Sequence, residues 1–359
     1  MTHLFGRDWT KRELLAQVGD LGQVAGVERF TYDDGVRDGV RAARVRTGGG
    51  LDFTVLLSRG IDISHASYKG MPLAWMSQTG EGHPHAFDPK GTGWLRTFYG
   101  GLLTTCGLRN VGAANVDEGE TLGIHGRLSH TPASEISTAT EWVGDDARIV
   151  VSGKLREATV FGENLRLTRR ITAPVGGAEF HIEDRIENLG FKTAPLMLLY
   201  HMNFGWPLVS PDTEIIVPSL TPAKPRDADA ANAAFSWNQL EKPQPDFAEQ
   251  CFFHDVAADA DGMASVLMVN RALRFGAQIT FDKSTLDCFT EWKMMGATEY
   301  VCGIEPANCL VMGRAAEREA GRLKTIAPGE ERLFRVSVRI LEGDEALART
   351  ESALRLLAE

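Results

Sequence analysis

An alternation of apolar and polar residues, repeated along the chain, is the sequence feature that most constrains its fold. In segment 165–171, three aliphatic residues and Arg169 alternate with polar residues, and segments 275–281 and 334–340 show the same period of two. Because successive side chains of a strand point to opposite faces, each segment predicts a strand with one buried face. Strands and helices do not alternate in the pattern, which disfavours a doubly wound parallel sheet. We therefore expect an all-β fold, a large antiparallel β-sandwich.

Short helices are expected at both ends of this sandwich. Thr10 and Glu13 have the spacing of a capping box, which predicts a helix over about residues 10–20. Asp344 is placed to cap a second helix over about residues 344–358.

Between the predicted helices, glycine and proline residues separate many short segments. The 37 glycines and 15 prolines are spread along the chain, as turns between numerous strands require. Segment 221–246 is rich in Ala, Pro and Asp, and we interpret it as a long surface loop because strand-like segments resume after it. The sequence thus predicts one domain over residues 1–359.

Charge and motif content exclude several classes of function. The 38 basic and 48 acidic residues give a net charge of -10, which argues against a nucleic-acid partner. No run approaches the ~18 apolar residues of a membrane span, and the first residues lack an apolar signal core, so we expect a cytoplasmic protein without membrane contact. Phosphate-loop, dinucleotide-binding and serine-elbow motifs are absent from the sequence. The five cysteines form no Cys-x-x-Cys pair, so neither disulfides nor structural zinc are expected, and the oligomeric state stays open.

One candidate site residue follows the nearly continuous apolar run 195–200. His201 continues the face of Met197 and Leu199, at the point where the strand leads to Gly205 and Pro207. A histidine there can donate or accept a proton near neutral pH. The alternative interpretation is a core histidine that is satisfied by a backbone carbonyl.

Residues next to His201 extend this candidate site. Asn203 offers an amide to a ligand, and Trp206 offers an aromatic platform for a sugar ring.

A second candidate is Glu305, which ends an apolar strand and directly precedes Pro306. Because proline removes a ladder donor, the carboxylate is expected at the rim of the sheet, where it can act as a general base. A surface or ion-paired glutamate is the alternative. Lys293, on the preceding segment, is a candidate donor to the ligand.

The third candidate segment is rich in glycine and arginine. His125 lies between Gly123 and Gly126, where the backbone can approach a ligand closely. Arg109, Asn110 and Arg127 offer rigid hydrogen-bond donors to hydroxyls or a carboxylate. Structural ion pairs explain these residues equally well.

The order of the three segments resembles the galactose mutarotase-like superfamily, and within it the bacterial aldose 1-epimerase-like proteins. The matching motifs are the Ile-His-Gly around His125, the Tyr-His-Met-Asn-Phe around His201 and the Gly-Ile-Glu-Pro around Glu305. The Ser-Arg-Gly-Ile-Asp-Ile segment that contains Arg59 is similar to a divergent branch of this superfamily. The resemblance covers residues 58–340.

The resemblance implies a supersandwich fold and a mechanism that uses neither metal nor other cofactor. It implies that Glu305 takes the proton of the anomeric hydroxyl and that His201 protonates the ring oxygen of a monosaccharide. It further implies that His125, Arg109 and Asn110 hold sugar hydroxyls.

The sequence departs from the family pattern at several positions. Asn203 replaces a tyrosine and Gly205 an asparagine. The sugar-binding aspartate of the family could be Asp212, Asp246 or Asp255. Positive donors at Arg59, Arg127 and Lys293 would suit an acidic or oxidised sugar.

Two alternative functions remain open from the sequence. The first is a carbohydrate-binding protein without turnover on the same scaffold. The second is a metal-dependent sugar isomerase, either through His83 and His85 or through a set of His125, His201 and Glu305. The neighbouring Gly82 and Pro84 favour a loop for the segment that contains His83 and His85.

Overall fold

Three antiparallel sheets form the body of the protein, as the alternation predicts. The structure, a computed structural model, describes residues 1–358. The largest sheet has eight strands in the order β11-β12-β13-β14-β25-β21-β20-β17. Their bounds are β11 Ser134–Val143, β12 Asp146–Ala158, β13 Asn164–Pro174, β14 Glu179–Asn188, β25 Glu331–Glu342, β21 Phe275–Asp282, β20 Met263–Asn270 and β17 Thr213–Ile216.

A six-stranded sheet packs against the first and carries the candidate site residues. Its order is β18-β19-β22-β23-β16-β8. The bounds are β18 Lys224–Pro225, β19 Gln250–His254, β22 Cys288–Met295, β23 Tyr300–Ala307, β16 Met197–Gly205 and β8 Thr104–Leu108. A five-stranded sheet completes the body, with β3 Gly26–Thr31, β4 Arg41–Arg46, β5 Leu51–Leu56, β6 Asp62–Tyr68 and β7 Met71–Pro72.

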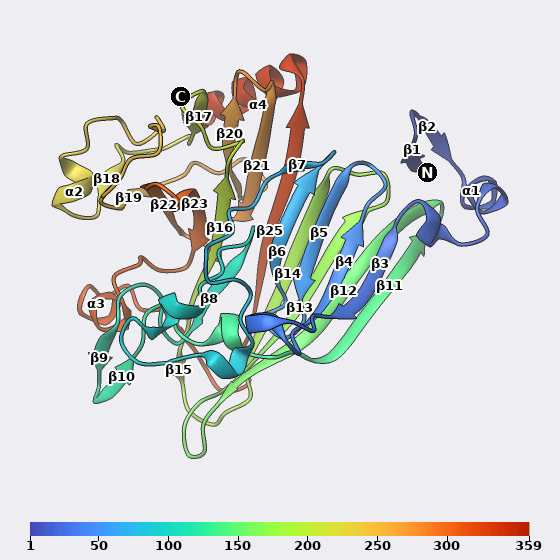
Figure 1. Ribbon diagram of the computed structural model, residues 1–359. Helices are drawn as coiled ribbons and strands as arrows, with labels where there is room; N and C mark the ends of the chain where they lie inside the picture. The colour runs from blue at the N-terminus through green and yellow to red at the C-terminus, as the bar shows by residue number, and fades with distance from the viewer. Residues whose placement is uncertain (359) are drawn as a thin grey trace.

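The remaining elements are short and lie around the sheets (Figure 1). Three two-stranded ribbons pair β1 Thr2–Leu4 with β2 Arg7–Trp9, β9 Asn115–Asp117 with β10 Glu120–Leu122, and β15 Ala194–Pro195 with β24 Thr325–Ile326. The α-helices are α1 Lys11–Gln17, α2 Ala228–Ala231, α3 Arg314–Glu319 and α4 Asp344–Leu356. The 3-10 helices are η1 Leu21–Gln23, η2 Gly35–Arg37, η3 Pro84–Ala86, η4 Gly93–Thr97 and η5 Leu128–His130.

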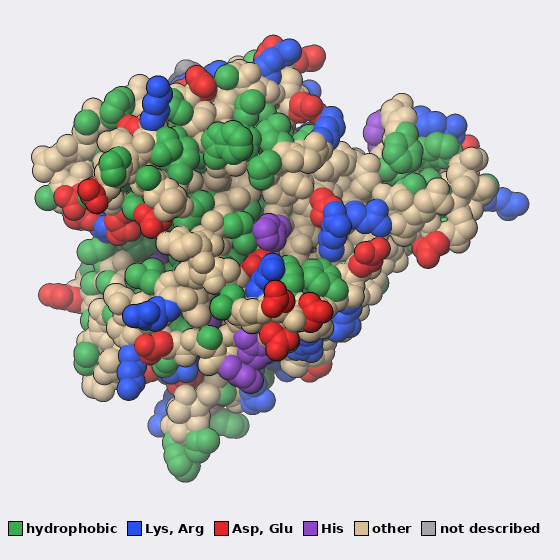
Figure 2. Space-filling view, in the orientation of Figure 1, with side chains coloured by type: hydrophobic (Ala, Val, Ile, Leu, Met, Phe, Trp, Pro, Cys, Tyr) green, Lys and Arg blue, Asp and Glu red, His purple; other side chains and the backbone are tan. Residues whose placement is uncertain are grey.

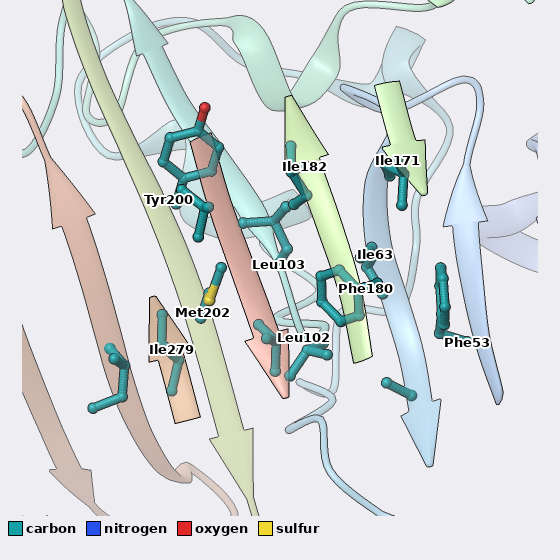
Figure 3. Close-up of a cluster of buried hydrophobic side chains, with 14 of the residues drawn as sticks. Phe53, Ile63, Leu102, Leu103, Ile171, Phe180, Ile182, Tyr200, Met202 and Ile279 are labelled. Carbon is teal, nitrogen blue, oxygen red and sulfur yellow. The ribbon is translucent and has the colours of Figure 1, made fainter. Parts of the chain in front are cut away.

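One hydrophobic core joins the three sheets. It contains Phe53 of the five-stranded sheet, Phe180 and Ile182 of the eight-stranded sheet, and Tyr200 and Met202 of the six-stranded sheet (Figure 3). The predicted strands have the expected alternation, and β13 buries every second residue over its length. Burial of these apolar faces is the main favourable contribution to folding. That the whole chain forms a single domain stays a prediction.

The terminal helices differ in detail from the sequence pattern. Helix α1 begins with the predicted capping box, in which Thr10 and Glu13 exchange hydrogen bonds, but it ends at Gln17 rather than near residue 20. Helix α4 has Gly343 as its N-cap, so the prediction that Asp344 caps it was wrong. Asp344 is instead the first helical residue and forms an ion pair with Arg274 at 2.8 Å.

Two surface properties bear on possible partners. Every helix within residues 1–358 is too short or too polar to cross a membrane. Acidic and basic side chains lie interspersed over the face in Figure 2, so the acidic excess forms no broad patch there. A net charge of this kind favours solubility.

Candidate active site

A cavity of about 530 Å³ opens on the face of the six-stranded sheet that points away from the common core. Four strands of this sheet each place one side chain in the cavity wall: His201 from β16, Glu305 from β23, Trp292 from β22 and Cys251 from β19. The alternation within β16 explains the position of His201. Its neighbours Tyr200 and Met202 point into the common core, and His201 therefore points to the opposite side.

His201 and Glu305 lie in contact at the bottom of this cavity. His201 Nε2 is 3.2 Å from Glu305 Oε1, and the two side chains are only 6% and 2% exposed. Within residues 1–358, His201 Nδ1 and Glu305 Oε1 are buried atoms without a hydrogen-bond partner. Because buried polar atoms are rarely left unpaired, these two atoms are an unusual feature of the site.

Gly303 makes room for the carboxyl group of Glu305. A Cβ atom at position 303 would lie 2.5 Å from Glu305 Oε1 and 3.1 Å from Trp292 Cβ. The missing side chain therefore allows Glu305 to bend along its own strand toward His201.

We expect Gly303→Ala to displace the Glu305 carboxyl and to lower the rate of any reaction that depends on it by about 10- to 100-fold, because a misplacement of about 1 Å at a reacting group has effects of that size. The folded state should persist, since a flexible carboxyl can rotate away from the new methyl group. The measurement is the turnover rate together with the thermal midpoint. Gly19→Ala is the matched control, because a Cβ there meets nothing within 4 Å. Unchanged turnover in Gly303→Ala would show that this position of Glu305 is not required.

Burial opposes a charge on either member of this pair. It lowers the pKa of His201 well below its ordinary value, the nearby titratable ring of His125 acts in the same direction, and the Asn203 side chain partly opposes both. Burial raises the pKa of Glu305 well above its ordinary value, with Glu249 adding to the effect and Arg226 opposing it. The two shifts favour a neutral His201 beside a protonated Glu305 over the corresponding pair of ions.

His125 forms a third polar group of the cavity. Its backbone has a positive φ of 58°, which is uncommon outside glycine and is frequent at functional sites. The loop can adopt this path because Gly126 has no side chain. A Cβ atom at this position would lie 2.4 Å from the carbonyl oxygen of Gly107. Burial lowers the pKa of His125 to about 4, so its ring is neutral at pH 7. Its Nδ1 accepts a hydrogen bond from the Gly112 amide at 3.3 Å, which leaves the proton on Nε2 as a donor.

Aromatic side chains make up much of the wall. Trp94 and Phe98, in and next to η4, stack with ring centroids 4.4 Å apart. Trp292 contacts the ring of His201 edge-on at 5.2 Å between centroids. The alternation of side-chain direction within β22 could have indicated Trp292. Trp94 and Phe98 lie in and next to a 3-10 helix, where no sequence periodicity indicates which side chains face a cavity.

Segment 221–246, interpreted from sequence as a surface loop, closes one side of the cavity. It contributes Arg226 and Asp227, between β18 and α2, and Glu249 follows shortly before β19. Arg226 donates to Asp227 Oδ2 at 2.6 Å and to Glu249 Oε1 at 2.9 Å. Sequence analysis missed these three residues, because only the return of β19 to the sheet brings the loop over the site.

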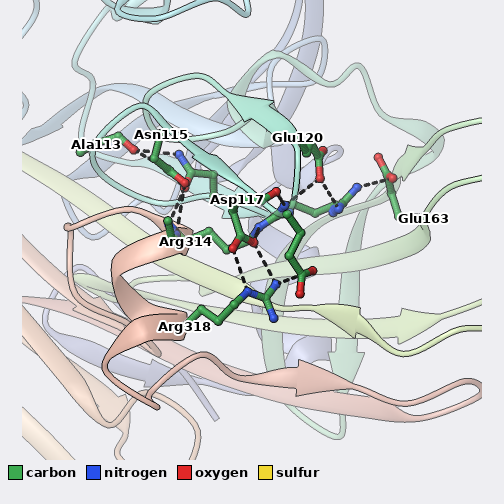
Figure 4. A network of polar contacts seen from close by, with 11 residues as sticks. Ala113, Asn115, Asp117, Glu120, Glu163, Arg314 and Arg318 are labelled. Carbon is green, nitrogen blue, oxygen red and sulfur yellow. Dashed lines mark hydrogen bonds and ion pairs between the residues drawn. The ribbon is translucent and has the colours of Figure 1, made fainter.

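Arg109 and Asn110, which the resemblance assigned to sugar hydroxyls, lie outside the cavity. Arg109 forms ion pairs with Glu120 and Glu163, two carboxylates that are labelled in Figure 4. The Asn110 amide donates to two backbone carbonyls, and its oxygen accepts from the backbone amide of Arg314 at 2.9 Å. The structure gives both residues an architectural role, because their hydrogen-bonding groups hold the loops that carry His125.

The other predicted donors also lie away from the cavity. Arg59 is fully buried and donates to three backbone carbonyls. Lys293 is on the core face of β22, where it pairs with Glu241 at 2.9 Å. Arg127 is exposed outside the cavity, and Trp206 is 68% exposed. The argument for an acidic sugar, which depended on Arg59, Arg127 and Lys293, therefore loses its basis.

Asn203 lies beside the site rather than in its wall. Its amide donates to the carbonyl oxygens of Gly101 at 3.0 Å and His201 at 3.1 Å. The side chain is fully buried, so it can influence His201 but does not reach the cavity.

The three aspartates considered for the family's sugar-binding position, Asp212, Asp246 and Asp255, are also absent from the cavity wall. Asp255 forms an ion pair with Lys283. Asp227 is the aspartate that reaches the wall, and it lies between His201 and Glu305 in the sequence.

Possible metal ligands do not converge in the described residues. Between residues 1 and 358, no group of three or more His, Cys, Asp or Glu side chains is arranged to hold a metal ion. His83 Nδ1 instead accepts a hydrogen bond from the backbone amide of His85 within η3. The metal-dependent alternative gains no support from this geometry.

Solved structures of other proteins share this architecture. A Klebsiella pneumoniae protein named as a candidate aldose 1-epimerase superposes with a TM-score of 0.87 at 23% identity, covering 93% of this chain and 88% of that protein. A galactose mutarotase-like protein of Clostridium acetobutylicum gives a TM-score of 0.62 at 13% identity, covering 89% and 99%. Galactose 1-epimerase of Lactobacillus acidophilus gives 0.59 at 13% identity, covering 89% and 100%. The TM-scores establish the fold, which is that of the galactose mutarotase-like proteins.

Sequence comparison gives a family for most of the chain. No curated protein has a sequence that matches significantly. Residues 37–340, which include the cavity and its three candidate groups, match the model of a domain of unknown function, DUF4432. The chain therefore belongs to the DUF4432 family and has the galactose mutarotase-like fold.

Proposed function

We propose that the protein is a sugar isomerase of the aldose 1-epimerase type, which interconverts the anomers of a monosaccharide by opening and closing its ring. The observation that carries this proposal is the buried contact between His201 and Glu305 at the bottom of an open cavity. The anomeric hydroxyl and the ring oxygen of a cyclic sugar are bonded to the same carbon. A proton donor and a proton acceptor in contact can therefore serve both oxygens at once.

In the proposed mechanism, the pair carries one proton and exchanges it with the sugar. In the neutral arrangement, His201 accepts the proton of the anomeric hydroxyl while Glu305 donates to the ring oxygen, and the bond between carbon 1 and that oxygen breaks. The aldehyde then rotates, and the protons return as the ring closes on its other face. The ionised arrangement implied by the family resemblance, with Glu305 as base and His201 as acid, has the same proton count. Burial favours the neutral arrangement as the resting state.

His125 supports this chemistry as a donor. Its ring lies 5.6 Å from that of His201 between centroids, and its Nε2 proton is available to a sugar oxygen. The stacked Trp94 and Phe98 and the edge of Trp292 offer apolar surfaces to the C–H groups of the ring.

The pH dependence follows from the two pKa shifts. Because the pKa of His201 is lowered, His201 becomes protonated beside a protonated Glu305 only well below pH 6.5. Because the pKa of Glu305 is raised, its carboxyl loses the shared proton only well above pH 4.5. We expect a plateau of the exchange rate across neutral pH. The apparent pKa values of the acid and alkaline sides of the profile belong to the coupled pair rather than to either residue. A profile that falls on the acid side with a midpoint at the ordinary histidine value would contradict this assignment.

Exchange of anomers at equilibrium, followed by NMR on a panel of neutral monosaccharides, tests the function. The proposal requires exchange faster than in buffer with at least one sugar, and loss of that acceleration in His201→Asn. Saturable binding without acceleration would instead identify a carbohydrate-binding protein on this scaffold.

A further inference from the structure

The polar side chains of the cavity wall are described as two sets. His125, His201 and Glu305 form the inner set, and Arg226, Asp227 and Glu249 form the outer set. In the proposed function, His201 and Glu305 are both used by the two oxygens of the reacting carbon. His125 is then the one inner side chain, among the described wall residues, that remains for another hydroxyl.

The two tryptophans of the wall do not offer their N–H groups to a ligand. Trp94 Nε1 donates to Ser129 Oγ at 3.1 Å, and Trp292 Nε1 donates to Glu249 Oε2 at 2.9 Å. Each indole therefore presents only apolar carbon to the cavity. Ile124, Val311 and Met312 add further apolar surface to the same wall.

Arg226 is already engaged by the protein. Its guanidinium donates to Asp227 and Glu249 as described above, and its Nη1 lies 3.0 Å from Cys251 Sγ. Among the wall residues within 1–358, Arg226 carries the one permanent positive charge, and two carboxylates neutralise it. A carboxylate or phosphate on the ligand would thus meet acidic groups without a free cation.

The donors that could have bound additional hydroxyls are held elsewhere. Arg109 pairs with Glu120 and Glu163, and the Asn110 amide is bound to backbone carbonyls. A ring hydroxyl that packs against the apolar part of the wall, at Trp94, Ile124 or Val311, would therefore lose its hydrogen bonds to water without gaining a partner.

We propose that the cavity selects an uncharged deoxy sugar, a monosaccharide in which hydrogen replaces at least one hydroxyl of the parent aldose. This inference rests on the proposed function of the same cavity. An apolar pocket discriminates against one added hydroxyl by up to about 100-fold. We expect the deoxy member of a matched pair to exceed its parent by about 10- to 100-fold in kcat/KM.

Matched sugars provide the test. The pairs are galactose with 6-deoxygalactose and glucose with 2-deoxyglucose, and galacturonate serves as the charged analogue of galactose. Anomer exchange is measured by NMR with the wild-type protein, and binding is measured by tryptophan fluorescence with Glu305→Gln. We expect at least one deoxy sugar to exceed its parent in both measurements and galacturonate to fall below galactose. Parents equal to or better than both deoxy sugars, or a preference for galacturonate, would overturn the inference.

A wall variant tests whether the apolar surface causes this preference. Val311→Thr replaces a methyl group by a hydroxyl of similar size at the cavity wall. The new hydroxyl can pair with a sugar hydroxyl, so the ratio of kcat/KM between the deoxy sugar and its parent should become smaller. Val143→Thr, at an exposed position of β11, is the control and should leave the ratio unchanged. An unchanged ratio in Val311→Thr as well would contradict the assignment to this wall.

The two readouts separate this inference from the proposed function. Preferential binding of a deoxy sugar without exchange by the wild-type protein would overturn the isomerase function and support the selectivity. Exchange of parent and deoxy sugars at equal rates would support the function and overturn the selectivity. Neither binding nor exchange with any of the five sugars would overturn both.

Discussion

Replacement of Glu305 by glutamine should lower the rate of anomer exchange by about 10²- to 10⁴-fold and should at the same time stabilise the protein near neutral pH. The loss of rate follows because glutamine keeps the shape of the side chain but can neither give nor take the proton that the pair shares. The gain in stability follows from burial, which disfavours the ionised carboxylate in the folded state.

The sign of the stability effect can be checked against pH. A carboxyl whose folded pKa is raised binds more protons in the folded than in the unfolded state once the pH exceeds 4.5, so its contribution to stability falls as pH rises. The wild-type protein and Glu305→Gln should therefore differ little below that pH, and the variant should gain its advantage above it. Urea unfolding at several pH values measures this.

The control for this experiment is a glutamate without such an environment. Glu345→Gln, at an exposed position in the first turn of α4, should change neither the exchange rate nor the pH dependence of unfolding. Full exchange activity in Glu305→Gln would remove Glu305 from the mechanism. A loss of stability in Glu305→Gln at neutral pH would contradict the role of burial.

Replacement of Arg169 by methionine should lower the free energy of unfolding by about 3–5 kcal/mol, the usual cost of breaking a buried ion pair from one side. Arg169 is fully buried and lies 2.9 Å from Asp62 Oδ1 and 2.6 Å from Asp184 Oδ2. It also donates to the carbonyl oxygen of Gly60, and Tyr200 donates its hydroxyl to Asp184. The substitution would leave two carboxyl groups in the core without their cation.

The adjacent arginine provides a matched control on the same strand. Arg170 points to the other face of β13 and forms an exposed ion pair with Glu141. Since exposed pairs contribute about 0–1 kcal/mol, Arg170→Met should change the free energy of unfolding by no more than that. Chemical denaturation of both variants gives the comparison. An equally small change in the free energy of unfolding in both variants would show that the buried ion pairs of Arg169 stabilise the fold no more than the packing of methionine does.

The alternation of residues was sufficient to predict the strands because side-chain direction in a strand is a local property. It placed Arg169 among the aliphatic residues of segment 165–171, and β13 does bury Arg169 with them. It also placed His201 on the face of Met197 and Leu199, which is the face that lines the cavity. The sequence indicated the start of α1 through the side-chain capping box of Thr10 and Glu13, but it did not indicate the N-cap of α4, because Gly343 has no capping side chain.

Which polar residues face a ligand could not be predicted in the same way. Arg109 was chosen as a sugar donor by its motif, but Glu163, 54 residues later, binds its guanidinium. Asp227 and Glu249 belong to a segment without strand or helix period, and their position over the site depends on the path of that segment between β17 and β19.

The sequence by itself determined the antiparallel strands, their buried faces and the face of β16 that carries His201, because these follow from a period of two. The prediction that Glu305 ends its strand at the rim of the sheet was wrong, because β23 continues through Pro306 to Ala307 and the Glu305 side chain is only 2% exposed. The tertiary structure alone decided that His201, Glu305 and His125 meet in one cavity while Arg59, Arg109 and Lys293 do not. The physical reason is that a charged side chain acquires its role from whichever partner the packing brings within hydrogen-bond distance. Arg109 and Lys293 each pair with a carboxylate more than 50 residues away in the sequence, Glu163 and Glu241, and the partners of Arg59 are backbone carbonyls.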